Sequence, residues 1–154
     1  MARQPRKSHD RQSGRGTPQA RSRSVEVAAA LVFRARKLLI AQRRSNAHLG
    51  GLWEFPGGKR EAHETFEECL RRELREELGI EIGPAEPFEA ITHRYPGKTV
   101  HLEFFWCLWK EHEPQALGCQ AFAWIGREQL DHFPFPAADA KLLRKLKRSA
   151  KLWR

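Results

Sequence analysis

The pattern of apolar and polar residues in the first half of the chain predicts two strands, a loop and one helix. The apolar runs VEVAAALVF and LLIAQR, joined by the polar RARK, predict two strands with a tight turn between them. Four glycines and a proline in residues 45–58 predict an irregular loop. Thr65 and Glu68 form a capping-box pattern and Gly79 is a stop signal, so we expect a helix over residues 66–78.

The second half of the chain predicts further strands and a final helix. PFEAITHRY and KTVHLEFFWCLWK are β-rich runs separated by the turn signal Pro96-Gly97, and the second run is apolar on both faces, as in a central strand. AFAWI predicts a short strand at 121–125. Residues 137–148 predict a helix whose basic side is either a solvated face, which we favour, or a nucleic-acid surface. This order predicts an α/β fold, a mixed sheet between helices.

Composition is typical of a soluble protein with one domain. The 154 residues are 40% hydrophobic, and no apolar run is long enough for a transmembrane helix or placed as in a signal peptide. We therefore expect a cytoplasmic monomer without a membrane partner. Cys69, Cys107 and Cys119 lack CxxC spacing, so we expect free or buried thiols rather than a disulfide or a zinc site.

Positive charge is concentrated at the N-terminus. Residues 1–24 hold seven Arg or Lys and one Asp, which accounts for +6 of the net charge of +9. They are rich in Ser, Gln, Gly and Pro and contain no aromatic residue, which predicts a disordered basic tail ahead of a folded domain at 25–150. The tail is either a solubilising extension, which we favour, or a salt-dependent contact with nucleic acid.

The stretch 58–80, GKREAHETFEECLRRELREELGI, holds seven glutamates. At about 100° per residue, Glu73, Glu76 and Glu77 share an arc beside the apolar stripe of the helix, whereas Glu68 lies on the opposite side with Arg71 and Arg75. Like charges crowded beside a core repel each other unless a cation compensates them. Because no Cys or His accompanies these oxygens at ligand spacing, we expect Mg²⁺ or Mn²⁺ and a phosphate-containing substrate.

The same stretch matches a known signature at nine fixed positions. With U an aliphatic residue, the Nudix box Gx5Ex7REUxEExGU is met by Gly58, Glu64, Arg72, Glu73, Leu74, Glu76, Glu77, Gly79 and Ile80. The flanking AQRRSNAHLGGLWEFPGGK and FPFPAADAKLL resemble the MutT-type branch of the Nudix hydrolases, and the resemblance covers about residues 25–148. It implies the family's α/β/α sandwich with a mixed β-sheet between helices.

The resemblance assigns roles to residues of the box. The positions that match the family's metal ligands are the carboxylates of Glu73, Glu76 and Glu77 and the carbonyl of Gly57. Arg72 would orient these carboxylates through charge-assisted hydrogen bonds. Glu64 matches the outer acid of the box, for which we expect a structural role rather than that of the base.

Further positions resemble substrate contacts of the MutT-type enzymes. They are Arg43, His48, Glu54, Phe55, Pro56, Gly57 and, late in the chain, Asp139. Phe55 or Trp53 would stack on a base. For Arg43 and His48 the alternatives are a solvent-exposed arginine and a histidine that packs within its loop.

Two residues depart from the family pattern. Asp139 stands where MutT carries an Asn that reads the oxidised guanine, although an Asp also occurs there in related sanitising enzymes. An Asp accepts from a base donor and donates when protonated. Gly118 stands where the family often has a metal-linked Glu, two residues before Gln120, so Glu77 or Glu76 is the expected base.

The resemblance implies Mg²⁺-dependent hydrolysis of a small nucleotide substrate. We expect oxidised or modified (d)NTPs such as 8-oxo-dGTP to yield the nucleoside monophosphate and pyrophosphate, which sanitises the nucleotide pool and prevents mutation. The alternatives are modified pyrimidine triphosphates, ADP-ribose, dinucleoside polyphosphates, or a non-catalytic Nudix-like module that recognises DNA.

Overall fold

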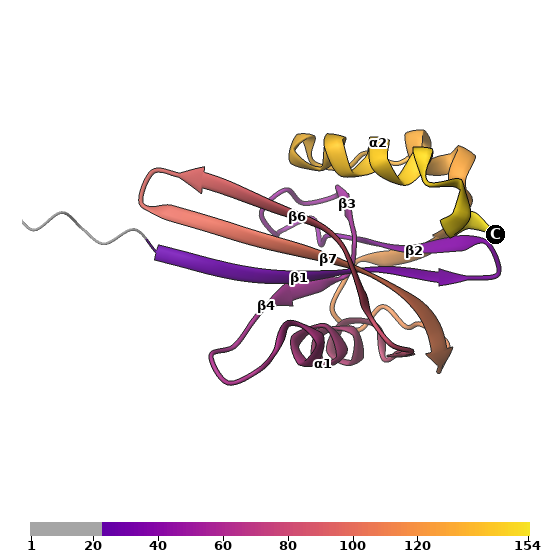
Figure 1. The fold of residues 1–154 in the computed structure, drawn as a ribbon, viewed down its shortest axis with the longest axis horizontal. Helices are drawn as coiled ribbons and strands as arrows, with labels where there is room; N and C mark the ends of the chain where they lie inside the picture. The colour runs from indigo at the N-terminus through magenta and orange to yellow at the C-terminus, as the bar shows by residue number, and fades with distance from the viewer. Residues whose placement is uncertain (1–22) are drawn as a thin grey trace, which may run out of the picture.

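The computed structural model describes residues 23–154, so the predicted tail lies almost entirely outside the described residues (Figure 1). The strands are β1 (Arg23–Arg34), β2 (Lys37–Gln42), β3 (Trp53–Glu54), β4 (Gly57–Lys59), β5 (Glu81–Ile82), β6 (Glu86–Tyr95), β7 (Lys98–Glu111) and β8 (Ala121–Ile125). The helices are α1 (Phe66–Leu78) and α2 (Ala140–Arg148), with 3₁₀ segments η1 (Arg127–His132), η2 (Ala137–Asp139) and η3 (Ala150–Trp153). Among these residues, no helix has the length and apolar character needed to cross a bilayer.

The strands form one mixed sheet with a helix on each face, which confirms the predicted α/β/α sandwich. The path β3-β2-β1-β7-β5 is extended by β4 beside β1, β6 beside β7 and β8 beside β2. Only β1 and β7 run parallel among the paired strands of the described chain. In Figure 1, α1 lies below the sheet and α2 above it.

Helix α1 has the predicted bounds because its ends are encoded locally. The Thr65 side chain accepts a hydrogen bond from the Glu68 N–H, and the Glu68 side chain accepts one from the Thr65 N–H. At the other end Gly79 adopts the left-handed conformation, with φ of 68°, and its N–H bonds the carbonyl of Arg75. Each cap is worth about 1 kcal/mol.

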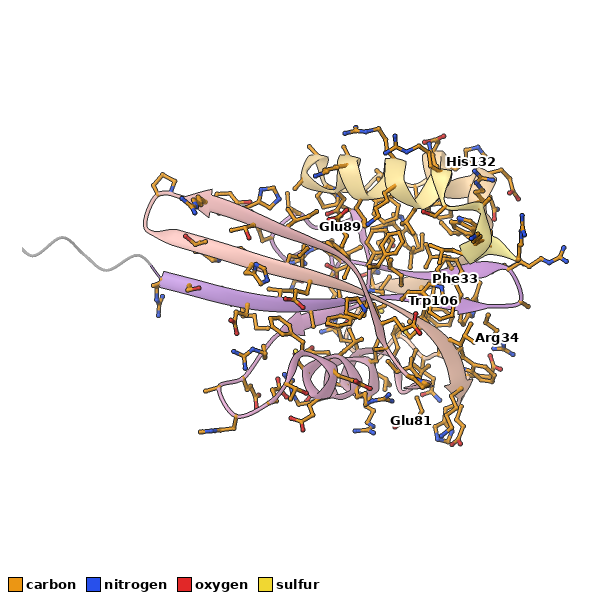
Figure 2. All side chains as sticks on the ribbon, in the orientation of Figure 1. Phe33, Arg34, Glu81, Glu89, Trp106 and His132 are labelled. Atoms are coloured by element: carbon orange, nitrogen blue, oxygen red, sulfur yellow. The ribbon has the colours of Figure 1, made fainter. Side chains whose placement is uncertain are left out.

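Alternate residues of the central strands pack into two separate hydrophobic cores, one on each face of the sheet. Ala28, Ala30 and Val32 of β1 face α1, together with the three cysteines, which are free and buried as expected. Ala29, Leu31 and Phe33 face α2 and pack with its buried leucines, which are Leu142 and Leu146. Figure 2 shows Phe33 on the α2 side of the sheet and its neighbour Arg34 on the α1 side.

The final helix and the loop 45–58 differ in part from the prediction. Helix α2 begins at Ala140 rather than at residue 137, because a 3₁₀ turn follows Pro136, and Leu143 is only half-buried. Within the glycine-rich loop, β3 pairs with β2 and β4 pairs with β1. Such short strands depend on their partners and leave no periodic signal.

Candidate active site

Arg72 of α1 contacts the carboxylates of three glutamates of the box. Its guanidinium contacts Glu64 through two nitrogens, at 3.0 and 2.6 Å, and its Nη1 donates to Glu73 at 2.9 Å and to Glu76 at 3.3 Å. Nη2 also donates to the carbonyl of Lys59 at 3.1 Å, which ties the helix to β4. The paired guanidinium lowers the pKa of Glu64 to about 2. Arg72 therefore fixes the directions of several carboxylates at once.

The carboxyl group of Glu73 occupies the space above Gly58. A Cβ atom at Gly58 would stand 2.3 Å from the Glu73 carboxyl carbon and 2.5 Å from each of its oxygens. No other residue type fits this position unless Glu73 moves. Burial raises the pKa of Glu73, and the hydrogen bond from Arg72 and its positive charge oppose that rise.

Glu77 is the most perturbed carboxylate of the site. Burial, followed by the charges of Glu54 and Glu73, raises the pKa of Glu77 to about 8, and a hydrogen bond from the Gly57 backbone opposes this rise only in part. Arg43 offsets little of the charge, since it is paired with Glu54 at 2.7 Å. Near neutral pH a proton or a cation is needed to stabilise this group.

The loop that carries Gly118 rests directly on Glu77. The N–H groups of Leu117 and Gly118 donate to the Glu77 carbonyl at 3.0 and 2.9 Å, and Arg44 donates to the carbonyl of Leu117 at 3.0 Å. A Cβ atom at Gly118 would lie 3.1 Å from Cα and 3.2 Å from Cγ of Glu77. Any side chain here would press on Glu77, which is a physical reason for glycine at this departure from the family pattern.

Arg43 and Glu54 form a second polar wall. Arg43 Nη1 donates to Glu54 at 2.7 Å, and its Nε donates to the carbonyl of His48 at 2.6 Å. Burial raises the pKa of Glu54 despite this pairing. The His48 side chain is exposed, so the structure places the backbone of His48, not its imidazole, against Arg43.

These walls enclose a cavity of about 530 Å³ with an apolar floor. Glu73 and Glu77 of α1 and Asp139 of η2 all line it, and burial followed by the charge of Glu54 raises the pKa of Asp139 to about 6. The floor and rim include Val27, Ala29, Leu49, Leu102, Phe104 and Pro136. The cavity thus combines an acidic end with an apolar slot, as suits a nucleotide.

The cavity gathers most of the residues that the sequence singled out. The lining includes Arg43, Glu54, Phe55, Gly57, Glu73, Glu77 and Asp139. The side chains of His48, Pro56, Arg72 and Glu76 do not line it. Sequence reasoning missed Lys59, the exposed last residue of β4, and the floor residues, which strands far apart in the chain bring together.

Both aromatic residues suggested for base stacking already pack against other aromatic rings. Phe55 is 5% exposed, stacks on Phe135 at 5.1 Å between ring centroids and meets Phe104 edge-on at 6.0 Å. Trp53 packs edge-on against Phe133 and does not line the cavity. Stacking of a base on Phe55 or Trp53 therefore stays a prediction, and Phe55 is the ring of the two that lines the cavity.

The donor set suits a hard divalent cation. Within residues 23–154, no three His, Cys, Asp or Glu side chains converge as a ready-made metal centre. Glu73 and Glu77 nevertheless face the same cavity, and Glu76 is adjacent to Glu73 through their shared contact with Arg72. Glu77 is a half-buried carboxylate whose pKa is raised to about 8, and a cation would stabilise its charged form.

Comparisons with known proteins identify the family of the chain. Residues 28–145 match the NUDIX domain family model. The chain is 40% identical over 120 residues to the CTP pyrophosphohydrolase of Escherichia coli, covering 77% of this chain and 88% of that protein. It is 35% identical over 113 residues to the 8-oxo-dGTP diphosphatase of the same organism, covering 73% and 87%.

A solved structure gives the same result for the fold. A chain from the structural work on MutT of Aliivibrio salmonicida and Vibrio cholerae superposes with a TM-score of 0.68 at 27% identity. The match covers 81% of this chain and 98% of that one. The box on α1, the sandwich and these similarities lead to one conclusion: the chain is a MutT-type member of the Nudix domain family.

Proposed function

We propose that this protein hydrolyses oxidised or modified (d)NTPs such as 8-oxo-dGTP, with Mg²⁺ or Mn²⁺, to the nucleoside monophosphate and pyrophosphate. The observation that carries the proposal is the cavity itself, whose lining combines Glu73, Glu77 and Asp139 with apolar side chains. A phosphate chain fits the acidic end only together with cations, and a base fits the apolar end. The similarity to 8-oxo-dGTP diphosphatases supports the same substrate class.

Glu73, Glu76, Glu77 and the carbonyl of Gly57 are the groups that would hold the cation. When bound, a divalent ion supplies positive charge that offsets the phosphates and favours attack by water on phosphorus. Arg72 keeps the carboxylates in position through its contacts with Glu73 and Glu76. Gly58 and Gly118 leave the room that Glu73 and Glu77 need.

The remaining polar groups of the cavity bind the substrate and accept a proton. Arg43 and Lys59 place positive charge where a phosphate chain enters. The attacking water must give its proton to a carboxylate, and we favour Glu77 over Glu76 because only Glu77 lines the cavity. Asp139 faces the base, where it accepts hydrogen bonds when ionised and donates one when protonated.

A panel of nucleotides tests the proposal. Pyrophosphate release is measured for 8-oxo-dGTP, dGTP, CTP and a modified dCTP, and nucleotide products are measured for ADP-ribose and a dinucleoside polyphosphate, in each case with Mg²⁺ and with EDTA. The proposal requires release from at least one modified triphosphate with Mg²⁺ and none with EDTA. A folded protein that hydrolyses only ADP-ribose or the dinucleoside polyphosphate would overturn the choice of substrate, and one that hydrolyses no member of the panel would instead be a recognition module.

CTP or a modified cytidine triphosphate is the second candidate substrate. Asp139 carries this alternative, because an ionised carboxylate pairs with the exocyclic amino group of cytosine. The similarity to the CTP pyrophosphohydrolase points the same way. In the panel, a larger kcat/KM for CTP than for 8-oxo-dGTP would favour this substrate without changing the reaction.

A further inference from the structure

The C-terminal segment of the chain is basic without any compensating acid. Residues 140–154, AKLLRKLKRSAKLWR, contain seven Lys or Arg and no Asp or Glu. A solvated helix normally mixes both signs, because oppositely charged neighbours three or four residues apart stabilise it. Helix α2 has no such pair within itself, although Lys145, Lys147 and Arg148 lie in its last turn, where positive charge is favourable.

The basic residues of this segment divide into two groups. Lys145 bonds the Phe88 carbonyl at 2.6 Å and pairs with Glu89 at 3.3 Å, and Lys147 pairs with Asp131. Figure 2 shows Glu89 on the sheet side of α2, beneath the helix. These two lysines therefore attach α2 to the rest of the domain.

The other group is directed to solvent. These residues are all exposed, and they make no ion pair with any residue of the described range 23–154. We call this group the basic stripe; it consists of Lys141, Arg144, Arg148, Lys151 and Arg154. The first three members follow the spacing i, i+3, i+7, so they lie on one face of α2 and extend over about 10 Å. The opposite face of the helix is buried through Leu142 and Leu146.

The basic stripe ends beside a hollow that is also basic. This hollow, of about 370 Å³, is lined by Arg36 and Lys37 from the β1–β2 turn, by Arg127 from η1 and by Trp153. Glu128 is its only acidic residue. Arg127 also donates to the carbonyl of Lys147, which joins the hollow to the end of α2.

We propose that the basic stripe and this hollow bind the phosphate backbone of a nucleic acid, without reading its sequence. A line of cations longer than one phosphate group suits a polymer of phosphates, and clustering along one helix is the electrostatic footprint of such binding. This reverses our preference from the sequence, because the structure shows which cations are already paired and which are not.

An anionic membrane is the less favoured partner. Binding at a bilayer surface needs exposed apolar side chains next to the cations. The large exposed apolar residues of the described chain are Leu49, Tyr95, Leu108 and Leu117, and none belongs to α2 or to the hollow. The apolar face of α2 is itself part of the core.

The test uses the full chain and a short fluorescent DNA duplex. Anisotropy is measured over a range of salt for wild type, for Lys141→Gln/Arg144→Gln/Arg148→Gln, and for the control Arg94→Gln/Lys98→Gln/Lys110→Gln, which removes the same charge from exposed positions of β6 and β7. The stripe variant should bind about tenfold or more weakly at low salt. Its slope of log K against log salt should fall by about 2 to 3, since each phosphate contact contributes about 0.9.

Three results would overturn the proposal. The first is a stripe variant that binds the duplex no worse than the control variant does. The second is wild type that binds vesicles of anionic lipid but not the duplex. The third is a stripe variant with unchanged duplex binding and a reduced kcat/KM for the nucleotide, because the stripe would then serve the substrate. Circular dichroism and unchanged pyrophosphate release establish that the variants are folded. If none of the three proteins hydrolyses the nucleotide, the proposed function fails, but the comparison of duplex binding still tests the basic stripe.

Discussion

Glu77→Gln should stabilise the protein when no metal is present. The pKa of Glu77 is about 8 in the folded chain, against an ordinary value of 4.5. Between pH 4.5 and pH 8, Glu77 is deprotonated in the unfolded chain but still protonated in the folded chain, so the free energy of unfolding falls as the pH rises. At pH 7 the cost is about 3 kcal/mol, because each pH unit above 4.5 contributes about 1.4 kcal/mol. Glutamine has nearly the same shape and carries no charge.

Urea denaturation in EDTA measures this effect. We expect Glu77→Gln to raise the free energy of unfolding by about 2 to 3 kcal/mol at pH 7 and by almost nothing at pH 4, where both states hold the proton. Glu67→Gln is the matched control, since Glu67 pairs with Arg71 on the outward side of the same helix, and its effect should stay within about 0.5 kcal/mol. Mg²⁺ should then stabilise wild type more than Glu77→Gln.

The reasoning is refuted if Glu77→Gln is as stable as wild type, or less stable, in EDTA at pH 7. Such a result would mean that the carboxylate is better solvated than its burial indicates. Equal stabilisation of both proteins by Mg²⁺ would separately refute the assignment of Glu77 to the cation.

Three further substitutions test other parts of the structure. Gly118→Ala should lower kcat about tenfold or more with a smaller change in KM, because its Cβ would displace Glu77; an unchanged kcat contradicts this. Asp139→Asn should stabilise the fold by about 1 kcal/mol at pH 8 but not at pH 3.5, because the raised pKa of about 6 makes the ionised group destabilising; equal effects at both pH values contradict this. Ala35→Asn should add about 0.5 to 1 kcal/mol in urea denaturation, because Ala35 has φ of 47° in the β1–β2 turn; destabilisation contradicts this.

Elements with local signals were predictable from the sequence. Helix α1 has its cap residues next to its ends, and β6 and β7 flank a Pro-Gly turn. The parallel pairing of β1 with β7 and the two-residue strand β5 were not predictable, because they depend on residues far apart in the chain. The same holds for the cavity floor, where Val27 of β1 and Leu102 of β7 meet.

For the carboxylates, the helical wheel gave the side of the helix but not the detailed environment. It placed Glu73, Glu76 and Glu77 on one arc. The structure leaves Glu76 with a side chain that is 59% exposed, whereas that of Glu73 is 15% exposed, because β4 covers only part of the arc. The close approach of Gly118 to Glu77 depends on a loop that begins beyond β7, so the sequence alone gave no reason for that glycine.

Pyrophosphate release from 8-oxo-dGTP by wild type and Glu77→Gln, with Mg²⁺, tests the central claim most directly. We expect turnover by wild type and a decrease of about a hundredfold or more in Glu77→Gln, which should remain folded, while Glu67→Gln keeps the wild-type rate. Wild-type turnover by Glu77→Gln would contradict the claim that this carboxylate belongs to the catalytic centre.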